Sequence, residues 1–381
     1  METKTLFKRE IGIENFIFLG CFFAFFIYVG SIMGGVNMIK TMMETGFDLL
    51  INICFYLMAV AVLAGAFSGL FSEFGVVALI NRLLAKFMHP IYDLPGASSL
   101  GILNCYLSDN PAILTLADDD NFRRYFKQYQ LPALTNLGTA FGMGLITTTA
   151  MMGLDVKSAL PAALLGNIGA IAGSILSVRI MIYFSKKKYG TEKMVSTKAS
   201  QLIPDKMRIV RDGGVGARFI QAMLDGGKSG VNMGLAIIPG VVIICTMVIM
   251  LTNGPSADGT YTGASREGIA VLPWIGQKLA FILKPVYGFT SPEAISVPIT
   301  ALGSTGAALG IVKNMAVAGK VSANDIAVFT AICMCWSGYI STHIAMMDAL
   351  DTKEMTGKAI LSHTIGGLFA GFVAHLLAFM L

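Results

Sequence analysis

The residue of this chain best suited to chemistry is a carboxylate in a short polar stretch between two mostly apolar arms, Ser108-Asp109-Asn110-Pro111. A charge near the middle of a membrane costs at least about 2.5–3.5 kcal/mol on insertion scales, so it needs a cation, a proton or hydrogen-bond donors. Asp109 also has the position of a helix cap before Pro111, and a capped helix N-terminus still presents N–H groups to a ligand. We therefore predict that Ser108, Asp109 and Asn110 bind a solute.

A second short stretch, Gly303-Ser304-Thr305-Gly306, also separates two apolar arms. Hydroxyl groups and glycines at a helix N-terminus can bind polar atoms of a solute, or its carboxylate, against the helix dipole. The same small residues also serve ordinary helix packing in membranes. With this alternative open, we predict that Gly303, Ser304 and Thr305 form the other half of the binding site.

Further polar side chains lie inside two apolar segments, 132–153 and 326–348. In the first, Asn136 and Thr139 offer oxygen atoms of the kind that hard cations prefer. In the second, Tyr339 can stack on a flat ring, Ser341 offers a hydroxyl group, and His343 can relay a proton or contact a solute. Packing inside the protein is the alternative for each of them. The pattern predicts a site for sodium at the first segment and for solute at the second.

The composition is that of an integral membrane protein. The chain is 55% hydrophobic and 13% charged, whereas soluble domains carry about 25% charged residues. The net charge is +5, but the basic residues cluster in one segment, 184–228, which indicates membrane topology and not nucleic-acid binding. The complete phosphate-binding loop Gly-x-x-x-x-Gly-Lys-Ser/Thr is absent, because the run Gly227-Lys228-Ser229 has Ala222 in place of the first glycine, and no hydrolase motif is present. We therefore expect no organic cofactor and no enzyme.

Segments of about 20 apolar residues are long enough to span a bilayer. Seven meet this length, and we predict about seven full spans: 15–35, 47–70, 132–153, 158–183, 230–252, 326–348 and 358–380. Two amphipathic segments, 74–88 and 269–283, have the spacing of helices that lie in the membrane interface. Each is followed by two arms too short to span. Arms around a polar tip predict re-entrant helical hairpins at 95–120 and 290–315, since irregular backbone in a membrane must be buried in protein or line a cavity.

Residues 74–152 and 269–347 align as two copies of one unit, 195 positions apart and without a gap. Two motifs support this register: Pro90-x-Tyr92 with Pro285-x-Tyr287, and Ala150-Met151-Met152 with Ala345-Met346-Met347. An odd number of predicted spans separates the copies, so the repeats are inverted. Repeats of this kind indicate a transporter with its substrate site where the repeats meet.

The positive-inside rule assigns 184–228 to the cytoplasm of a plasma (cytoplasmic) membrane, with the N-terminus inside and the C-terminus outside. We predict four parts: an N-terminal transmembrane helix (1–46), a first repeat (47–183), the basic cytoplasmic loop (184–228) and a second repeat (229–381).

This order of parts resembles the concentrative nucleoside transporters and the wider group of proteins with a nucleoside-recognition, or "gate", domain. Residues 103–111 stand where the transporters carry Gly-Asn-x-x-x-Gly-Gln-Thr-Glu-Ser-Pro, and residues 335–342 are similar to their unwound Cys-Gly-Phe-Ala-Asn-Phe-Ser-Ser. The resemblance implies all-α inverted repeats, each with an interfacial helix, a re-entrant hairpin and two core helices. It also implies a homo-oligomer, a trimer in that family.

The same resemblance assigns roles to residues of this chain. It implies sodium binding at Asn104 and substrate binding at Ser108, Asp109 and Asn110, and it aligns Tyr339 and Ser341 with substrate-contacting positions. The family's Lys-Leu-x-x-Asn-Glu-Phe run, whose glutamate holds the ribose, has no counterpart around 310–314. A nucleobase, another heterocycle or an organic acid is therefore an alternative to a nucleoside.

We predict a secondary active transporter of a small polar solute, coupled to sodium or protons, that works by alternating access. Two alternatives from other classes are a non-transporting component of a membrane assembly and an intramembrane enzyme that uses Asp109. A catalytic partner within hydrogen-bond reach of Asp109 would favour the enzyme.

Overall fold

The computed structural model describes residues 10–110, 112–113, 123, 125–195, 210–256 and 258–381. Within this part the chain is helical and has no strand, only the isolated bridge between Lys127 and Met194. Three of the described helices are long and apolar enough by length and composition to cross a membrane: Ile13–Met33, Ala159–Tyr189 and Lys353–Ala378. The predicted all-α polytopic membrane fold with inverted repeats is confirmed.

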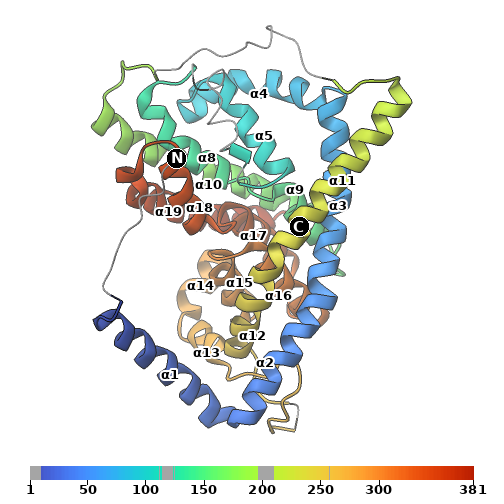
Figure 1. Cartoon of the computed structure of the whole chain (residues 1–381), viewed down its shortest axis with the longest axis vertical. Helices are drawn as coiled ribbons and strands as arrows, with labels where there is room; N and C mark the ends of the chain where they lie inside the picture. Colours follow the sequence, from blue (N-terminus) through green and yellow to red (C-terminus); the bar gives the residue numbers. More distant parts are fainter. Residues whose placement is uncertain (1–9, 111, 114–122, 124, 196–209, 257) are drawn as a thin grey trace.

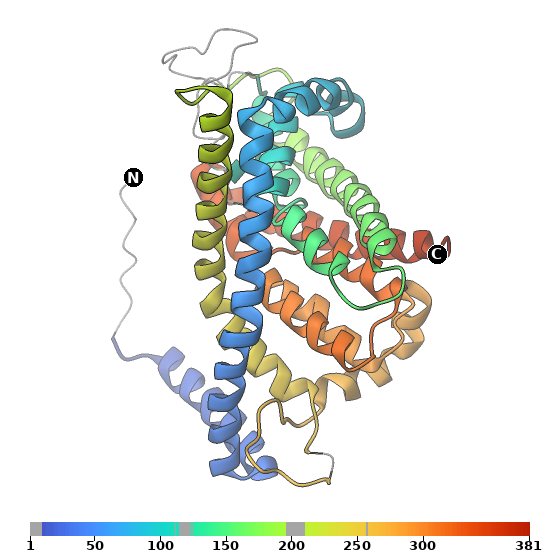
Figure 2. The same cartoon turned by 90° about the vertical axis from the view of Figure 1, so that its right-hand side faces the viewer.

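Two long helices stand side by side and form one wall of the molecule (Figures 1 and 2). The first runs unbroken through α2 (Gly35–Leu49), the π-helical turn η1 (Leu50–Cys54) and α3 (Phe55–Glu73). The second runs antiparallel to it through α11 (Val215–Gly240), the π-helical turn η4 (Val241–Cys245) and α12 (Thr246–Thr252). Each turn has five residues and ends in Ile-Cys. The two helices are therefore counterparts in the two repeats.

Glycines bring the backbones of α3 and α11 into contact. A Cβ atom added at Gly65 would lie 2.3 Å from the carbonyl oxygen of Gly226, and one added at Gly230 would lie 2.3 Å from that of Ala61. Small residues allow such close approach in membranes, where no hydrophobic effect drives helices together. The helix α11 begins at Val215, inside the segment 184–228 that we interpreted as a basic loop, and α10 extends into that segment as far as Tyr189.

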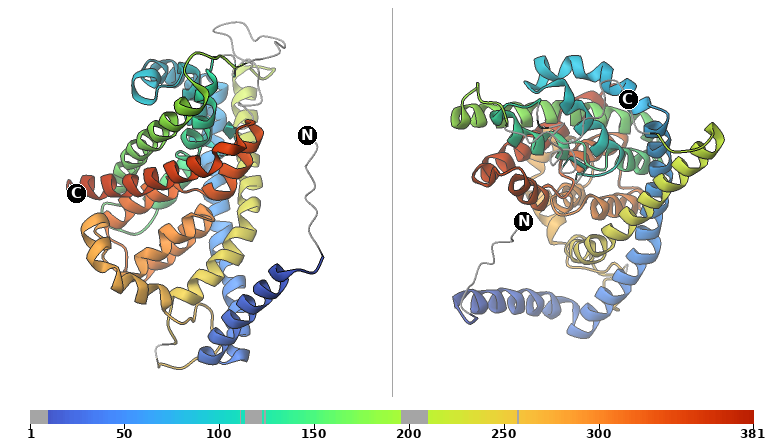
Figure 3. Two further views of the ribbon diagram at one scale, coloured as in Figure 1. Left: turned by 90° about the vertical axis from the view of Figure 1, so that its left-hand side faces the viewer. Right: turned by 45° about the horizontal axis from the view of Figure 1, so that its top comes forward.

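The remaining elements follow the repeat. In the first half they are α4 (Val76–Tyr92), α5 (Ser99–Leu107), α8 (Leu131–Thr139), α9 (Gly144–Met152) and α10 (Ala159–Tyr189). In the second half they are α13 (Val271–Lys278), α14 (Ala280–Tyr287), α15 (Ser296–Ala301), α16 (Thr305–Val317), α17 (Ala323–Cys335), α18 (Tyr339–Ala349) and α19 (Thr356–Ala378). The amphipathic helices α4 and α13–α14 lie toward opposite ends of the molecule (Figure 1), as inverted repeats require. The helix α1 (Ile13–Met33) projects from the body (Figure 3).

Backbone conformation repeats in the same register as the sequence. Three pairs of residues 195 positions apart have left-handed φ: Gly75 and Ala270 (77° and 50°), Asp93 and Gly288 (57° and 65°), Met143 and Gly338 (52° and 56°). The first pair precedes α4 and α13, the second follows α4 and α14, and the third precedes α9 and α18. Non-glycine residues are uncommon in this region, so three coincident pairs are strong support for the repeat.

The Pro-x-Tyr motifs hold the interfacial helices to the core. Tyr92 shares a hydrogen bond of 2.7 Å with Ser174 of α10, and Tyr287 donates to the carbonyl oxygen of Leu368 of α19 at 3.4 Å. The long core helices α10 and α19 are thus each bound by an equivalent tyrosine, one from each repeat. Their own contact uses glycine again, because a Cβ at Gly173 would lie 2.5 Å from the carbonyl oxygen of Gly366.

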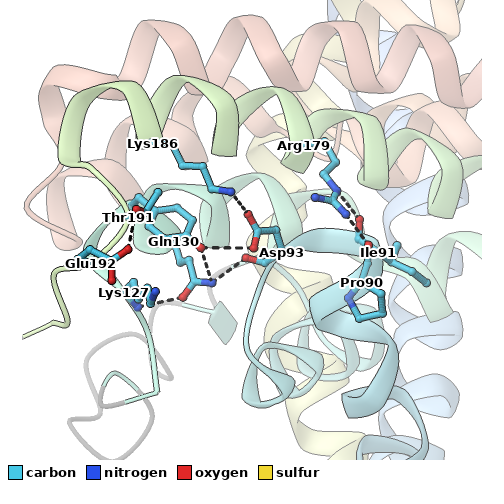
Figure 4. Close-up of polar contacts among 10 residues, drawn as sticks. Pro90, Ile91, Asp93, Lys127, Gln130, Arg179, Lys186, Thr191 and Glu192 are labelled. Atoms are coloured by element: carbon cyan, nitrogen blue, oxygen red, sulfur yellow. Dashed lines mark hydrogen bonds and ion pairs between the residues drawn. The ribbon is translucent and has the colours of Figure 1, made fainter.

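The end of α4 is also held by charge (Figure 4). Arg179 donates from Nε to the carbonyl oxygen of Ile91 at 2.6 Å and also to that of Pro90, and Lys186 pairs with Asp93 at 2.5 Å. At the counterpart position the amide of Asn324 donates to the carbonyl oxygen of Tyr287 at 2.8 Å. Both ends satisfy carbonyl groups that a helix C-terminus leaves without partners.

Two of the predicted full spans are wrong as continuous helices. The segment 132–153 divides into α8 and α9 after Thr139, and the segment 326–348 divides into α17 and α18 after Cys335. The resemblance implied one partly unwound core helix in each repeat, and it located the unwound residues, 335–342, only in the second. Both breaks lie inside the body of the fold, where their backbone groups are buried in protein, which is the condition for irregular backbone in a membrane.

Candidate functional site: two helix breaks and two hairpin tips

The helix breaks are the centre of the candidate site. The first comprises residues 140–143 and the second residues 336–338, and each ends at one of the left-handed residues, Met143 or Gly338. The breaks are adjacent, because the thiol of Cys335 lies 3.9 Å from the carbonyl oxygen of Ala140. A break releases carbonyl groups from helical hydrogen bonds, and in an apolar interior they need other donors.

The tip of the first hairpin lies between the two breaks. Asn110 donates from its side-chain amide to the carbonyl oxygen of Ser337 in the second break at 2.5 Å. Its side-chain oxygen lies against Gly142 in the first break, where an added Cβ would be 1.7 Å from it. Asn110 is 2% exposed, and its Oδ1 has no hydrogen-bond partner among the described residues. The site thus contains a buried acceptor next to the backbone of both breaks.

Asp109 has a different surrounding from Asn110. It is only partly buried by accessible area, and it accepts the backbone N–H of Asn110 at 2.7 Å. No histidine, serine or second acid donates to it within the described residues. Ser108, one residue earlier, lines a cavity of about 260 Å³ between the tip, α3, α9 and α11. Pro111 and residues 114–122, which include most of the predicted second arm, lie outside the described residues.

The tip of the second hairpin meets the second break. The N–H of Gly338 donates to the carbonyl oxygen of Ala301 at 3.1 Å, and an added Cβ at Gly338 would lie 3.2 Å from that of Gly303. Thr305 donates to the carbonyl oxygen of Cys333 at 2.7 Å, and Ser304 caps α16 by accepting the N–H of Ala307 at 3.2 Å. The structure therefore brings both predicted tips to one break.

A series of linked side-chain hydrogen bonds from α8, α10 and α19 holds the second break. The Nε2 of His363 donates to the carbonyl oxygen of Cys335, which is the last residue of α17. A carbonyl can only accept, so Nδ1 of His363 is the acceptor and receives the hydroxyl of Ser177 at 3.0 Å. That hydroxyl in turn accepts the amide of Asn136 at 2.9 Å. The series joins α8, α10, α19 and α17.

Sequence reasoning missed His363 and Ser177. Both lie in apolar segments, 358–380 and 158–183, that we interpreted as plain spans. A histidine inside such a segment is a signal in itself, because an ionisable residue in a span is rare without a partner. The partner, a main-chain carbonyl at a helix break, leaves no mark in the sequence.

Tyr339 and His343 lie in a packed aromatic cluster. Tyr339 shares a hydrogen bond of 2.6 Å with Thr364, and Nδ1 of His343 is 2.9 Å from the carbonyl oxygen of Tyr339. The rings of His343 and His363 are 4.8 Å apart, and the side chain of His343 is fully buried. In this arrangement both residues face neighbouring helices. The side chain of Ser341 lies outside the described residues.

Within the described part of the chain no hydrogen bond joins the three residues predicted for sodium. Asn136 faces α10 and donates also to the carbonyl oxygen of Ala359 at 3.1 Å, while its Oδ1 has no partner there. Thr139 donates back to the carbonyl oxygen of Thr135 at 2.7 Å, and Asn104 is partly exposed on α5. Among the described residues no group of three His, Cys, Asp or Glu could hold a metal ion.

No protein-family model matches the sequence, and no curated protein matches it significantly. Solved structures do. The inward-facing, substrate-bound form of CNTnw is 16% identical with a TM-score of 0.53, over 96% of this chain and 85% of CNTnw. A doubly substituted CNTnw in an outward-facing state is 17% identical with a TM-score of 0.55, over 95% and 84%. The chain has the fold of a concentrative nucleoside transporter. The resemblance to that fold stated from the sequence is confirmed, and at this identity the likeness concerns the fold.

Proposed function

We propose that this protein is a secondary active transporter that moves a small polar solute across the membrane by alternating access, driven by sodium or protons. The observation that carries the proposal is the meeting of both hairpin tips with the repeat-related helix breaks. Asn110 contacts both breaks, and Gly303 contacts the second. Sites of this construction, in which broken helices of two inverted repeats face one another, hold solutes and coupling ions near the middle of transporters.

The solute class follows from the groups near the tips. Amide, hydroxyl and main-chain groups predominate there, with one carboxylate at Asp109. These favour an uncharged heterocycle that forms several hydrogen bonds, such as a nucleobase or a nucleoside. CNTnw, whose fold this chain shares, is a nucleoside transporter that was solved with substrate bound. The ribose-binding glutamate of that family has no counterpart here, which favours the base over the sugar as the recognised part.

The geometry gives less support to an intramembrane enzyme. A carboxylate that acts as a general acid or base needs a reacting group or a catalytic partner within hydrogen-bond reach. In the described structure the carboxylate of Asp109 accepts only the backbone N–H of its neighbour Asn110.

The test is ligand-dependent thermal stabilisation of the purified protein with nucleobases, nucleosides and organic acids, each with sodium chloride and with choline chloride. A ligand that binds only the folded protein raises its stability by RT ln(1 + [L]/Kd). We expect a sodium- or pH-dependent shift with one class, and uptake of that compound into proteoliposomes. Asp109→Asn should abolish or reduce the shift. Asp155→Asn, an exposed carboxylate in the turn before α10, is the matched control.

A contrary result would be informative. If no compound of the three classes stabilises the protein while its unfolding remains cooperative, the transport proposal fails, and a role as a component of a larger membrane assembly takes its place.

A further inference from the structure

The interfacial helix is whole in the first repeat and broken in the second. In the first repeat α4 runs unbroken from Val76 to Tyr92. In the second, Leu279 separates α13 from α14, with φ of −92° and ψ of 2°. The two stretches align without a gap. The break therefore adds no residue, and it bends a helix that is continuous in the other repeat.

Residues that touch in the first repeat line a cavity in the second. In the first repeat the chain that follows α4 packs back on that helix, and a Cβ added at Gly96 would lie 3.0 Å from the Cβ of Ala85. The counterparts of these two residues, 195 positions later, are Ser291 and Ala280. Both line a cavity of about 450 Å³ between α13, α14 and the residues that follow α14. The broken helix thus leaves open a space that the first repeat fills.

The walls of this cavity carry a cation and polar groups that the fold does not use. Lys284 and Gln277 line the cavity, and within the described part of the chain neither side chain has a hydrogen-bond or ion-pair partner. Thr290 and Ser291 add hydroxyl groups to the walls. The hydroxyl of Thr290 donates to Asp325 at 2.6 Å, so toward a ligand it can only accept. The cavity therefore offers one positive charge together with amide and hydroxyl groups.

The acids near the cavity do not pair with Lys284. Glu293 follows the last lining residue in the chain, and it pairs with Lys320 at 2.6 Å. Asp325 is fully buried and does not line the cavity, and it also accepts the N–H and the hydroxyl of Ser322 at 2.9 Å and 2.8 Å. A cation without a protein partner in a concave site attracts an anionic group. The lining therefore favours a ligand with a negative charge.

The apolar surface of the two half-helices indicates where that anion comes from. Large side chains of α13, of α14 and of the break between them are exposed: Trp274, Leu279, Phe281 and Ile282. An amphipathic helix with such a surface lies at the boundary between lipid headgroups and acyl chains, and tryptophan is typical of that depth. A phospholipid can place its phosphate at Lys284 while its acyl chains cover the apolar side chains. A soluble anion would use the cation alone.

We propose that the cavity at the break between α13 and α14 binds the headgroup of an anionic phospholipid. The phosphate lies at Lys284, and hydroxyl groups of the headgroup bind Gln277, Thr290 and Ser291. The site belongs to the second repeat alone, because the equivalent space in the first repeat is closed. It does not depend on the transport function proposed above.

The experiment compares two lipids that differ only in the headgroup. Purified, delipidated full-length protein in detergent is titrated with phosphatidylglycerol or with phosphatidylcholine of the same acyl chains, and native mass spectrometry gives the Kd of the first bound lipid. We expect phosphatidylglycerol to bind more tightly. Lys284→Gln should weaken its binding about fivefold, which corresponds to about 1 kcal/mol for one lysine at an anionic surface, and should leave phosphatidylcholine unchanged. Lys284→Arg should retain the preference.

Three controls separate the cavity from the general charge of the surface. Lys278→Gln removes an exposed lysine of α13 that does not line the cavity, and it should leave the binding of phosphatidylglycerol unchanged. Ala280→Leu fills the cavity from an exposed position without a change of charge, and it should weaken that binding at an unchanged unfolding temperature. The soluble compound sn-glycerol 3-phosphate, which lacks acyl chains, should not displace the lipid.

An equal Kd for the two lipids in the parent protein overturns the proposal. So does an unchanged affinity for phosphatidylglycerol in folded Lys284→Gln or Ala280→Leu. An equal loss in Lys278→Gln would mean that surface charge alone attracts the lipid, and displacement by sn-glycerol 3-phosphate would mean that the cavity binds a soluble anion. No outcome requires a transported solute, so failure of this proposal and failure of the proposed function are told apart.

Discussion

The two hairpins occupy equivalent places in the repeat but are held in different ways. The first inserts the side chain of Asn110 between the helix breaks, and its Ser108 lines a cavity of about 260 Å³. The second has its arm α16 almost wholly buried and fixed to both π-helical turns of the long helices. Inverted repeats with equal halves would give equal surroundings. The alternating access proposed above requires two sides of a site that differ in this way.

The fixation of α16 uses groups that the π-helical turns expose. Lys313 donates to the carbonyl oxygen of Asn52 in η1 at 3.0 Å and lies 3.7 Å from the ring centre of Tyr56. The thiol of Cys245 in η4 donates to the carbonyl oxygen of Ala307 at 2.9 Å. Turns of this type are common at functional sites because they leave a main-chain group without its helical partner.

The largest expected effect comes from filling the space at the first tip. In Gly142→Ala the new methyl group would overlap the side chain of Asn110, so the tip cannot seat, and we expect a loss of about 1–3 kcal/mol of stability or more together with the loss of ligand-induced stabilisation. The matched variant Gly303→Ala meets only the flexible end of Ile244 at 3.1 Å and should be tolerated. Thermal unfolding of both variants, with and without solute, makes the comparison. Equal effects would mean that the two tips are seated alike.

The next largest effect is expected at the hydrogen bond from His363 to Cys335, which holds the second break. His363→Ala leaves the carbonyl oxygen of Cys335 without this donor and the hydroxyl of Ser177 without its acceptor, and an unsatisfied buried group costs about 1–3 kcal/mol. The residue at the counterpart position, 195 places earlier, is Ile168. Its side chain cannot donate a hydrogen bond to the first break. We expect Ile168→Ala to act through packing alone. Amide hydrogen exchange in α17 and α18 should rise in His363→Ala only, and a rise confined to α8 and α9 would contradict this assignment.

A smaller effect should follow from releasing the second arm. Lys313→Met keeps the apolar stem but removes the hydrogen bond to Asn52 and the contact with Tyr56, worth about 1–2 kcal/mol together. In a chain whose only cysteine is Cys245, reaction with N-ethylmaleimide should become faster, because α16 covers that thiol. Lys320→Met, which removes an exposed pair with Glu293, is the control. An unaltered labelling rate in Lys313→Met would show that other contacts hold the arm.

A further expected effect, which depends on pH, is acid sensitivity beside the second repeat. Glu267 lies in the loop between α12 and α13 and is 3% exposed. Burial alone would raise the pKa of its carboxyl, but hydrogen bonds from the Ser256 hydroxyl, from the amide and hydroxyl of Thr262, and from the Gly263 amide outweigh burial and lower the pKa to about 2. A lowered folded-state pKa stabilises the protein above the unfolded value of 4.5, and the stability is lost as pH falls from there toward about 2.

Unfolding temperatures measured between pH 7 and pH 3 test this sign. Glu267→Gln should be less stable than the parent at pH 7, and the difference should shrink as pH falls. The exposed Asp212→Asn should follow the parent throughout. If the difference in unfolding temperature grew on acidification, the hydrogen bonds around Glu267 would not favour its ionised carboxylate.

The sequence predicted the architecture well because the repeat left two kinds of local signal. The Pro-x-Tyr motif marks the end of each interfacial helix, and the structure shows why, since Tyr92 and Tyr287 each bind a long core helix. The hydrophobic segments and the amphipathic spacing predicted the two hairpins and the inverted orientation of the repeats. These features depend on residues close in the chain, or on two copies of one local pattern.

The helix break at 140–143 could not be predicted in this way. Its surroundings are mostly apolar and would continue a helix, and Gly142 and Gly144 are the local signs of a break. What stabilises the break is distant in sequence, namely Asn110 from the hairpin tip and the second break at Cys335. The same holds for the candidate site. Asn110, Gly303 and Thr305 were predicted from their place at the tips. His363 and Ser177 act through a main-chain carbonyl that only the folded chain places beside them.

The residues with left-handed φ indicate how the two repeats arose. In each of the three pairs one member is glycine and the other is not: Gly75 with Ala270, Gly288 with Asp93, Gly338 with Met143. Glycine adopts this conformation without strain, so the economical ancestor is a half-length chain with glycine at all three places, duplicated in opposite orientations. After duplication the first copy lost two of these glycines, at Asp93 and Met143, and the second copy lost the third, at Ala270, while the backbone kept the same conformation at all three places. The two hairpins then diverged by later substitutions, while both halves kept the backbone shape that they had inherited.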